Sequence, residues 1–345
     1  EAIWDAFKRK EVYATTGSRI SVRVFGGWDF AADEVERAAA AAGAIAATMR
    51  TPQAWRESAQ GQALSDLPVI TVERLGPAPK TPVRAAARPL DGLKVLDLTR
   101  VIAGPVCGRV LAAHGADVLA ISAPHLPSMA ELAIDVGRGK RSAHLDLRAA
   151  DDGRHLAGLI ADADIFVQGY RPGGLAARGF GPAAVAALKP GIIYVSLTAY
   201  GHIGPWADRR GFDSIAQTAI GLNHSEARAA GLMDQPKALP AQALDHGSGY
   251  LMALGALAAV LKRAEEGGSW HVRVALARTG RWLQDLPKVT GGPATADHGR
   301  PDDFLEETAS GFGQLRALRH AGMVAGMTPR WTRPSVPLGH DRPMW

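Results

Sequence analysis

The chain has 345 residues, of which 47% are hydrophobic and 21% are charged, and its formal net charge is +5. A chain of this length can bury the core of one large domain or of two medium ones. Its Lys and Arg residues are scattered among acidic residues and form no basic stripe, which argues against nucleic-acid binding and leaves anionic small molecules as the expected partners.

The first part of the chain gives few predictions. Residues 1–30 form an unassigned N-terminal segment, in which the stretch from Glu11 to Trp28 indicates two strands around a turn and is similar to part of an unrelated, poorly characterised bacterial family. Residues 31–88 begin with an alanine-rich helix, expected over Ala31–Met49. They end in a linker, because Pro77–Pro89 holds four prolines among alanines. This linker is the expected domain boundary.

Residues 89–289 alternate short β-rich runs with helical patterns, which is typical of βαβ units. Strands are expected at Lys94–Leu98, Asp117–Ile121, His144–Leu147, Ile165–Gln168, Ile192–Leu197 and His271–Ala277. Helices are expected from Gly104 to about Gly115, over Asp151–Ala161 and over Ser248–Ala264. The predicted fold class is α/β, a doubly wound parallel sheet over residues 93–277 with ligands at the carboxyl ends of its strands.

Single residues and short runs add expectations about the surroundings of the chain. Cys107 is the only cysteine and has no Cys/His cluster beside it, so we expect a cytoplasmic chain that holds no metal. The longest apolar stretch, Tyr250–Leu261, is about half the length needed to span a bilayer, so no membrane contact is expected. The tail, residues 290–345, is rich in Gly, Pro and Arg and is expected to be partly irregular except where Trp331 or Trp345 docks.

Several motifs follow one another along the expected sheet. They are Pro89–Pro105 with its Leu-Asp-Leu-Thr-Arg run, Gly137–Ser142, Val167–Gly173, Ser196–Pro205, Gly211–Gln217 and Leu239–Tyr250. In this order they resemble the family III CoA-transferases, which include formyl-CoA transferase, carnitine CoA-transferase and α-methylacyl-CoA racemase. The resemblance covers roughly residues 89–289. It implies a Rossmann-like large domain, coenzyme A thioesters as substrates, a carboxylic acid as acceptor and a homodimer.

The resemblance also implies a coenzyme A site. Its residues lie in the turn after the first strand, in a basic pair and in later loops: Arg100, Val101, Ile102, Ala103, Lys140, Arg141, Gln168, Tyr170, Arg171, Arg178 and Arg210. A helix N-terminus after the turn would attract an anion through its free N–H groups. Lys140 and Arg141, expected on a mobile loop, would suit the phosphates of coenzyme A. A plain strand-to-helix turn and a solvated basic turn are the alternatives.

Asp245 is the candidate nucleophile, because the resemblance places it where the family keeps its catalytic aspartate. From the residues alone, an aspartate before a Gly-Ser-Gly step and a long apolar helix is an N-cap. A carboxylate can attack an acyl thioester to give a mixed anhydride, and the released thiolate can convert this into an aspartyl-CoA thioester. Backbone N–H groups of Gly247, Ser248 and Gly249 are expected to stabilise the oxyanion.

Two further observations leave alternatives open. Asp213 resembles an acidic residue that arranges the family's active site, and an N-cap is again the other interpretation. Phe212 occupies a position that, by the resemblance, is a histidine in the racemase branch of the family. A phenylalanine cannot carry a proton, so a CoA-transferase is favoured over an acyl-CoA racemase. Few residues follow the last expected strand, and residues 50–75 resemble a remnant found in two-part members. A non-catalytic, coenzyme A-binding half of a transferase is therefore also considered.

Overall fold

The computed structural model describes residues 31–83, 86–232, 235–287, 300–322 and 326–345. Its helices are α2 (Ala32–Ala41), α3 (Pro52–Glu57), α4 (Ala59–Ala63), α5 (Ala103–Ala113), α6 (Ala130–Val136), α7 (Ala150–Asp162), α8 (Pro182–Leu188), α9 (Asp213–Ala219), α10 (Leu222–Ala229), α11 (Ala243–Glu266) and α12 (Leu276–Asp285), with short 3-10 turns at Ala176–Arg178 and Pro301–Phe304. Its strands are β1 (Thr71–Gly76), β2 (Lys94–Leu98), β3 (Asp117–Ser122), β4 (Lys140–His144), β5 (Ile165–Gln168), β6 (Ile193–Thr198), β7 (Ser269–Ala275), β8 (Leu305–Ser310) and β9 (Gly313–Leu318).

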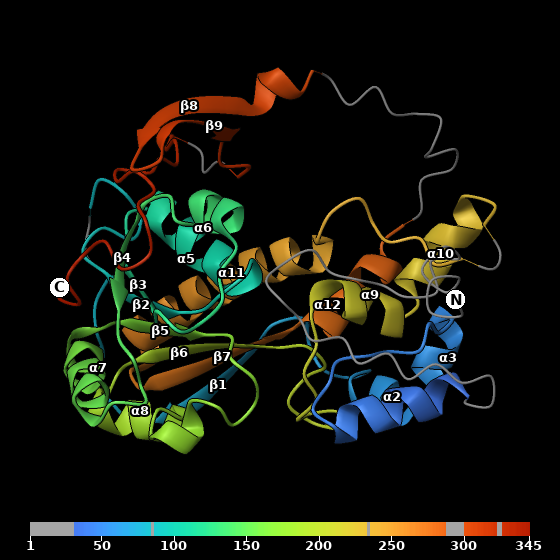
Figure 1. Ribbon diagram of the computed structural model, residues 1–345. Coiled ribbons are helices and arrows are strands. Elements are labelled where there is room, and N and C mark those ends of the chain that lie inside the picture. The colour runs from blue at the N-terminus through green and yellow to red at the C-terminus, as the bar shows by residue number, and fades with distance from the viewer. Residues whose placement is uncertain (1–30, 84–85, 233–234, 288–299, 323–325) are drawn as a thin grey trace.

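Seven of these strands form one sheet in the order β1-β7-β6-β5-β2-β3-β4 (Figure 1). Every neighbouring pair is parallel except β1 and β7. The chain therefore winds outward from β2 in both directions, first to β3 and β4 and then to β5, β6 and β7. The order reverses between β2 and β5, and such a reversal opens a crevice for ligands at the carboxyl ends of the strands. The predicted doubly wound parallel sheet is confirmed.

Helices cover both faces of this sheet (Figure 1). On one face α5 and α11 pack against strand residues such as Val95 and Val195. On the other face α7 and α8 pack against residues such as Leu96 and Phe166. Successive strand residues point to opposite faces, so strands buried on both sides are apolar almost throughout. A polar residue in such a strand is therefore a signal of a specific role.

A third apolar cluster joins α3, α9, α11 and α12 beside the carboxyl ends of the strands. Trp55 and Tyr200 lie at its centre, with ring centroids 6.4 Å apart. Ile220 and Leu244 anchor α9 and α11 in the same cluster. This packing fixes the N-terminal ends of α9 and α11 near each other, and these two ends carry Asp213 and Asp245.

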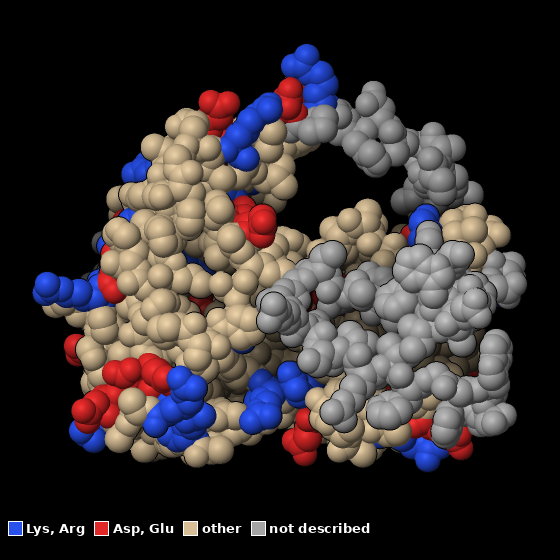
Figure 2. Space-filling view, in the orientation of Figure 1, with Lys and Arg blue, Asp and Glu red and all other residues tan. Residues whose placement is uncertain are grey.

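Helix α11 runs through the centre of the molecule. Gly249 allows its close approach to α5, since a Cβ there would lie 2.6 Å from the carbonyl oxygen of Ala103. Among the described helices it is the one with the length and apolar composition to cross a bilayer, and its apolar residues are used against α5 and β7. Basic and acidic side chains are interspersed over the face of the molecule seen in Figure 2.

The tail returns to the sheet after the antiparallel hairpin of β8 and β9. The N–H of Asp341 donates to the carbonyl oxygen of Ser142 at 2.7 Å, which covers part of the edge strand β4. Trp331 Nε1 donates to the carbonyl of Arg109 and Trp345 Nε1 to that of Leu159, both at 3.0 Å. The docking of both tryptophans is confirmed, whereas the hairpin was not predicted.

Several predicted boundaries are wrong. Strand β4 lies upstream of the predicted His144–Leu147. Helix α2 ends at Ala41, before Gly43 with its φ of 70°, and does not reach Met49. Helix α11 begins at Ala243 and not at Ser248, because packing of the Gly-Ser-Gly step against neighbouring helices outweighs its low helix propensity. The strands predicted between Glu11 and Trp28 lie outside the described residues.

Candidate active site

Asp213 and Asp245 are joined directly. The backbone N–H of Asp245 donates to Asp213 Oδ2 at 2.8 Å, and Gln217 Nε2 donates to Asp213 Oδ1. Both aspartates are buried, with exposed fractions of 1% and 8%. Asp213 is the first residue of α9 and its side chain binds the first turn of α11, so it caps a helix other than its own.

The N-cap interpretation of Asp245 is wrong. Asp245 is the third residue of α11, whose N-cap position is occupied by Gln242 without a side-chain capping bond. Its N–H is satisfied by Asp213, as described above. The carboxyl of Asp245 thus has no role in closing its own helix, and its burial needs another explanation.

Burial, and to a smaller extent the neighbouring charge of Asp213, raise the pKa of Asp245 to about 8. Burial also raises the pKa of Asp213, while hydrogen bonds from the N–H groups of Asp245 and Leu244 and from Gln217 lower it. Of the two, Asp213 is better prepared to hold the negative charge. A buried carboxyl group with a strongly raised pKa beside a second carboxyl group is a candidate for chemistry.

The three residues predicted to supply oxyanion donors do not present free N–H groups. Gly247, Ser248 and Gly249 lie inside α11, where backbone N–H groups from the second turn onward bind helix carbonyls. The prediction of free donors in this stretch is therefore wrong for this conformation. Ser248 Oγ instead shares a hydrogen bond of 2.8 Å with Thr279 Oγ1, and both residues are fully buried. The Gly-Ser-Gly sequence allows α11 to pack closely against α5 and α12.

The turn from Arg100 to Ala103 connects β2 to α5 at the reversal of strand order. Val101 in this turn has a φ of 71° and is the one non-glycine residue with positive φ in the described part of the chain. For a β-branched residue such a conformation costs roughly 1–3 kcal/mol, and strain of this kind persists where the surroundings impose it. Asp245 and Gly249 are one helical turn apart on α11, so Asp245 faces the α5 side of the helix, where Gly249 meets Ala103.

The expected basic pair does not lie on a mobile loop, because both residues belong to β4. Lys140 turns into the core, where its Nζ lies 2.7 Å from Asp97 Oδ2 and donates to the carbonyl of Pro105. Arg141 Nη2 lies 2.8 Å from Asp117 Oδ2, and its guanidinium group lies over the ring of Trp345. In this structure both cations are engaged within the chain.

The remaining predicted residues are spread over the loops that follow β5 and β6. The N–H of Tyr170 donates to Gln168 Oε1 at 3.1 Å, which shapes the loop after β5. Burial raises the pKa of Tyr170, and the charge of Arg100 lowers it. A Cβ at Gly169 would lie 3.8 Å from Thr99 Cγ2, so the loop after β5 approaches the residues that lead into the β2–α5 turn. The guanidinium groups of Arg178 and Arg210 donate to the carbonyls of Leu147 and Gly43. The loop of Tyr170 therefore lies near the β2–α5 turn, whereas Arg178 and Arg210 are hydrogen-bonded to backbone carbonyls in other parts of the chain.

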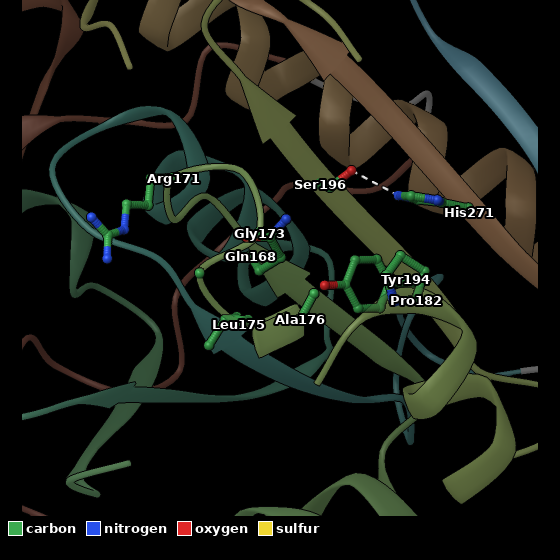
Figure 3. A pocket seen from close by; sticks show the side chains of 10 residues that line it. Gln168, Arg171, Gly173, Leu175, Ala176, Pro182, Tyr194, Ser196 and His271 are labelled. Carbon is green, nitrogen blue, oxygen red and sulfur yellow. Dashed lines mark hydrogen bonds between the residues drawn. The ribbon is translucent and has the colours of Figure 1, made fainter. Parts of the chain in front are cut away.

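One polar pair was missed from the sequence. Ser196 Oγ and His271 Nε2 lie 2.8 Å apart on neighbouring strands of the face opposite α11, and both are buried (Figure 3). They line a cavity of about 170 Å³ together with Gln168 and Tyr194, while Arg171 lies at its mouth and points away from the pair. Burial lowers the pKa of His271 to about 3, so it is neutral. Both are polar residues in strands that are buried on both faces, and this pattern could have identified them from the sequence.

The fold and site together define an α/β protein with a reversal of strand order, the place where ligands bind in this class of fold, and a buried acidic pair. Residues 90–305 match the sequence model of CoA-transferase family III, and the chain belongs to this family. Residues 1–64 match a family of unknown function, DUF3604, a match that extends past residue 30 into α3 and α4.

Individual relatives agree with this assignment. An acetyl-coenzyme A transferase of Hypoxylon pulicicidum is 39% identical over 210 residues, which are 60% of this chain and 35% of that protein. An acyl-CoA transferase of Gibberella moniliformis is 33% identical over 259 residues, or 72% of this chain and 45% of that protein. The chain thus spans less than half the length of these two relatives.

A solved structure supports the fold. The crystal structure of a hypothetical protein from Mycobacterium tuberculosis aligns with a TM-score of 0.53 and 31% identity over 66% of this chain and 64% of that one. An orthorhombic crystal form of the same protein aligns with a TM-score of 0.63 at 22% identity, over 73% of this chain and 97% of that one.

Proposed function

We propose that this protein is an acyl-CoA:carboxylate CoA-transferase in which Asp245 is the nucleophile. The observation that carries the proposal is the buried Asp213–Asp245 pair, because a carboxyl group with a pKa of about 8 in this position closes no helix and pairs with no cation in the described part of the chain. Membership of CoA-transferase family III supports the substrate class, coenzyme A thioesters and carboxylic acids.

The proposed reaction has four steps. Ionised Asp245 attacks the acyl thioester carbonyl, which forms a mixed anhydride and releases coenzyme A thiolate. The thiolate attacks the aspartyl carbonyl of this anhydride, so the first carboxylate leaves and an aspartyl-CoA thioester remains. The acceptor carboxylate then displaces the thiolate to form a second mixed anhydride. Attack of the thiolate on the acceptor's acyl carbon releases the new acyl-CoA and restores the Asp245 carboxylate.

Asp213 is proposed to act through its position and its charge. Its hydrogen bond to the N–H of Asp245 holds the first turn of α11, and its negative charge raises the pKa of the nucleophile. A more basic carboxylate is the stronger nucleophile once it is ionised, following Brønsted behaviour. The two acidic groups therefore have different tasks, with the charge held mainly on Asp213 in the free protein.

The coenzyme A chain is proposed to enter at the β2–α5 turn. Free N–H groups at the start of α5 and the strained backbone at Val101 support this placement. Arg100 in this turn and the exposed Arg171 in the loop after β5 are the cations that are proposed to meet the phosphates. A cytoplasmic homodimer is proposed on the family resemblance and the single cysteine alone.

Racemization is the less favoured alternative. It requires a second proton carrier beside Asp245, and the residue before Asp213 is Phe212, which is 42% exposed and has no ionisable group. His246 follows Asp245 directly, but burial and the charge of Arg109 lower its pKa, against an opposite effect of Asp135.

An exchange experiment tests the proposal. Wild type and Asp245→Asn are incubated with an acyl-CoA and its isotope-labelled free acid, and label entering the acyl-CoA pool is measured, while coenzyme A binding is followed by calorimetry. The proposal predicts exchange by the wild type only and binding by both proteins. Binding without exchange by the wild type would instead support a non-catalytic coenzyme A-binding protein. Exchange by the variant would remove Asp245 as the nucleophile.

A further inference from the structure

We propose that the buried Asp97–Lys140 ion pair is a positioning device for the β2–α5 turn, acting through the hydroxyl group of Thr99. Lys140 is then not a phosphate ligand, and its task is to hold the carboxylate that fixes the turn. The inference rests on the proposed coenzyme A site at Arg100–Ala103 and deepens it.

The ion pair is fully enclosed. Lys140 Nζ lies 2.7 Å from Asp97 Oδ2, and the two side chains are 3% and 2% exposed. The same Nζ donates to the carbonyl of Pro105 at 2.7 Å, which ties the pair to the first turn of α5. The second carboxylate oxygen, Asp97 Oδ1, accepts a hydrogen bond from Thr99 Oγ1. One carboxylate therefore connects β4, α5 and the end of β2.

Two glycines of α5 make room for this arrangement. A Cβ at Gly108 would lie 2.4 Å from Asp97 Oδ2 and 2.9 Å from Lys140 Nζ, so the helix crosses the ion pair without a side chain. A Cβ at Gly104 would lie 2.3 Å from Thr99 Cγ2. Thr99 is thus held between the carboxylate on one side and the backbone of α5 on the other.

The restraint acts next to the strained residue. Thr99 precedes Val101 by two positions, and Val101 has the positive φ described above. Such a conformation persists only where neighbouring contacts over-determine it. A hydrogen bond to a charged acceptor is about twice as strong as one between neutral groups, so an ionised Asp97 is suited to this task.

Stability alone does not explain the ion pair. The desolvation of two buried charges can exceed their attraction, and a well-packed apolar pair of similar volume is often as stable. The contacts given above are instead concentrated on one turn, at the reversal of strand order where ligands bind in this class of fold. This placement points to a role in ligand binding.

The direct test removes only the hydroxyl group. Thr99→Val keeps the branched shape and leaves the ion pair intact, whereas Thr99→Ser keeps the hydroxyl. We expect Thr99→Val to bind coenzyme A about tenfold more weakly in calorimetry, because the turn is no longer held in its binding conformation, and to lower the melting temperature slightly, because Asp97 Oδ1 loses its donor. In the transfer assay the KM for acyl-CoA should rise by a similar factor while kcat changes little. Thr99→Ser should restore both values.

A paired replacement tests the ion pair itself. Asp97→Leu with Lys140→Met leaves no uncompensated charge and should fold, yet weaken coenzyme A binding like Thr99→Val. The matched control is Asp164→Asn with Arg263→Met, which removes another largely buried ion pair of 3.0 Å at the opposite end of the strands. The control should change the melting temperature and leave coenzyme A affinity unchanged.

Three results would overturn the inference: wild-type affinity in Thr99→Val, equal losses in Thr99→Val and Thr99→Ser, or an equal loss of affinity in the control pair. If the double variant at Asp97 and Lys140 does not fold, the two Thr99 variants alone test the positioning role. If the wild type itself binds no coenzyme A, the proposed function fails. The positioning role is then also rejected, because it requires that site.

Discussion

The backbone N–H of Asp245 donates a hydrogen bond of 2.8 Å to the carboxylate of Asp213, so one acidic side chain holds the helix that carries the other. The two residues are 32 positions apart and belong to α11 and α9. Both carboxyl groups are buried, and the charge of Asp213 adds to the effect of burial in raising the pKa of Asp245. Most of the behaviour expected of this protein follows from that pair.

Asp245→Asn is expected to gain stability relative to the wild type as the pH rises. The pKa of Asp245 is about 8 in the folded protein against an ordinary value of 3.8. The stability tied to its proton is therefore complete at low pH and is lost as the pH rises from about 4 to about 8. Asparagine has no proton to lose. The difference in unfolding free energy should grow toward pH 8, on the order of a few kcal/mol, in urea titrations. A difference that does not vary with pH would contradict the burial of this charge.

Asp213→Asn is expected to shift the pH dependence of transfer. Removing the charge of Asp213 lowers the pKa of Asp245, so the rising limb of kcat/KM against pH should move to lower pH. The amide oxygen can still accept the N–H of Asp245. Asp213→Leu removes that acceptor as well and should lower the melting temperature. An unshifted pH profile in Asp213→Asn would mean that the two groups do not interact electrostatically.

Gly249→Ala is expected to impair transfer more than folding. The added Cβ would lie 2.6 Å from the carbonyl oxygen of Ala103 and must push α11 away from α5. A small displacement of Asp245 should reduce kcat about tenfold or more. Gly247→Ala is the matched control, because its Cβ would meet only a side-chain methyl group at 3.3 Å. Similar rates for the two variants would show that the spacing of α11 and α5 is unimportant for the site.

Trp331→Ala is expected to release the tail from the large domain. The indole donates to the carbonyl of Arg109, and the guanidinium group of Arg138 lies 4.1 Å from the ring centroid. Loss of both contacts should reduce the unfolding free energy by about 2 kcal/mol. Trp331→Phe keeps an aromatic ring but loses the N–H donor and part of the packing area, so a smaller effect than that of Trp331→Ala is expected. Equal effects of the two substitutions would assign the docking to the N–H group alone.

The sequence predicted the sheet well and the contacts of the site poorly. Strands β2 and β5 begin and end at the predicted residues because apolar residues dominate both short runs, although β2 also contains Lys94 and Asp97. Both aspartates were named as candidates, but no local pattern indicates a hydrogen bond between residues so far apart in the chain.

The errors have physical causes. The Gly-Ser-Gly step signals the start of a helix by propensity, yet Gly249 is needed inside α11 for its contact with Ala103. Lys140 was expected on a mobile loop, and no local pattern indicates its ion pair because its partner Asp97 lies 43 residues away. Asp97 itself could have been noticed, since a charged residue in a doubly buried strand requires a partner.

The central claim is that Asp245 becomes covalently modified during transfer. The most direct measurement is to mix the protein with an acyl-CoA and hydroxylamine, quench the reaction, digest the chain and locate the adduct by mass spectrometry. We expect a hydroxamate on Asp245 that requires acyl-CoA and is absent in Asp245→Asn. Sustained transfer with no adduct on Asp245, or with an adduct on another residue, would contradict it.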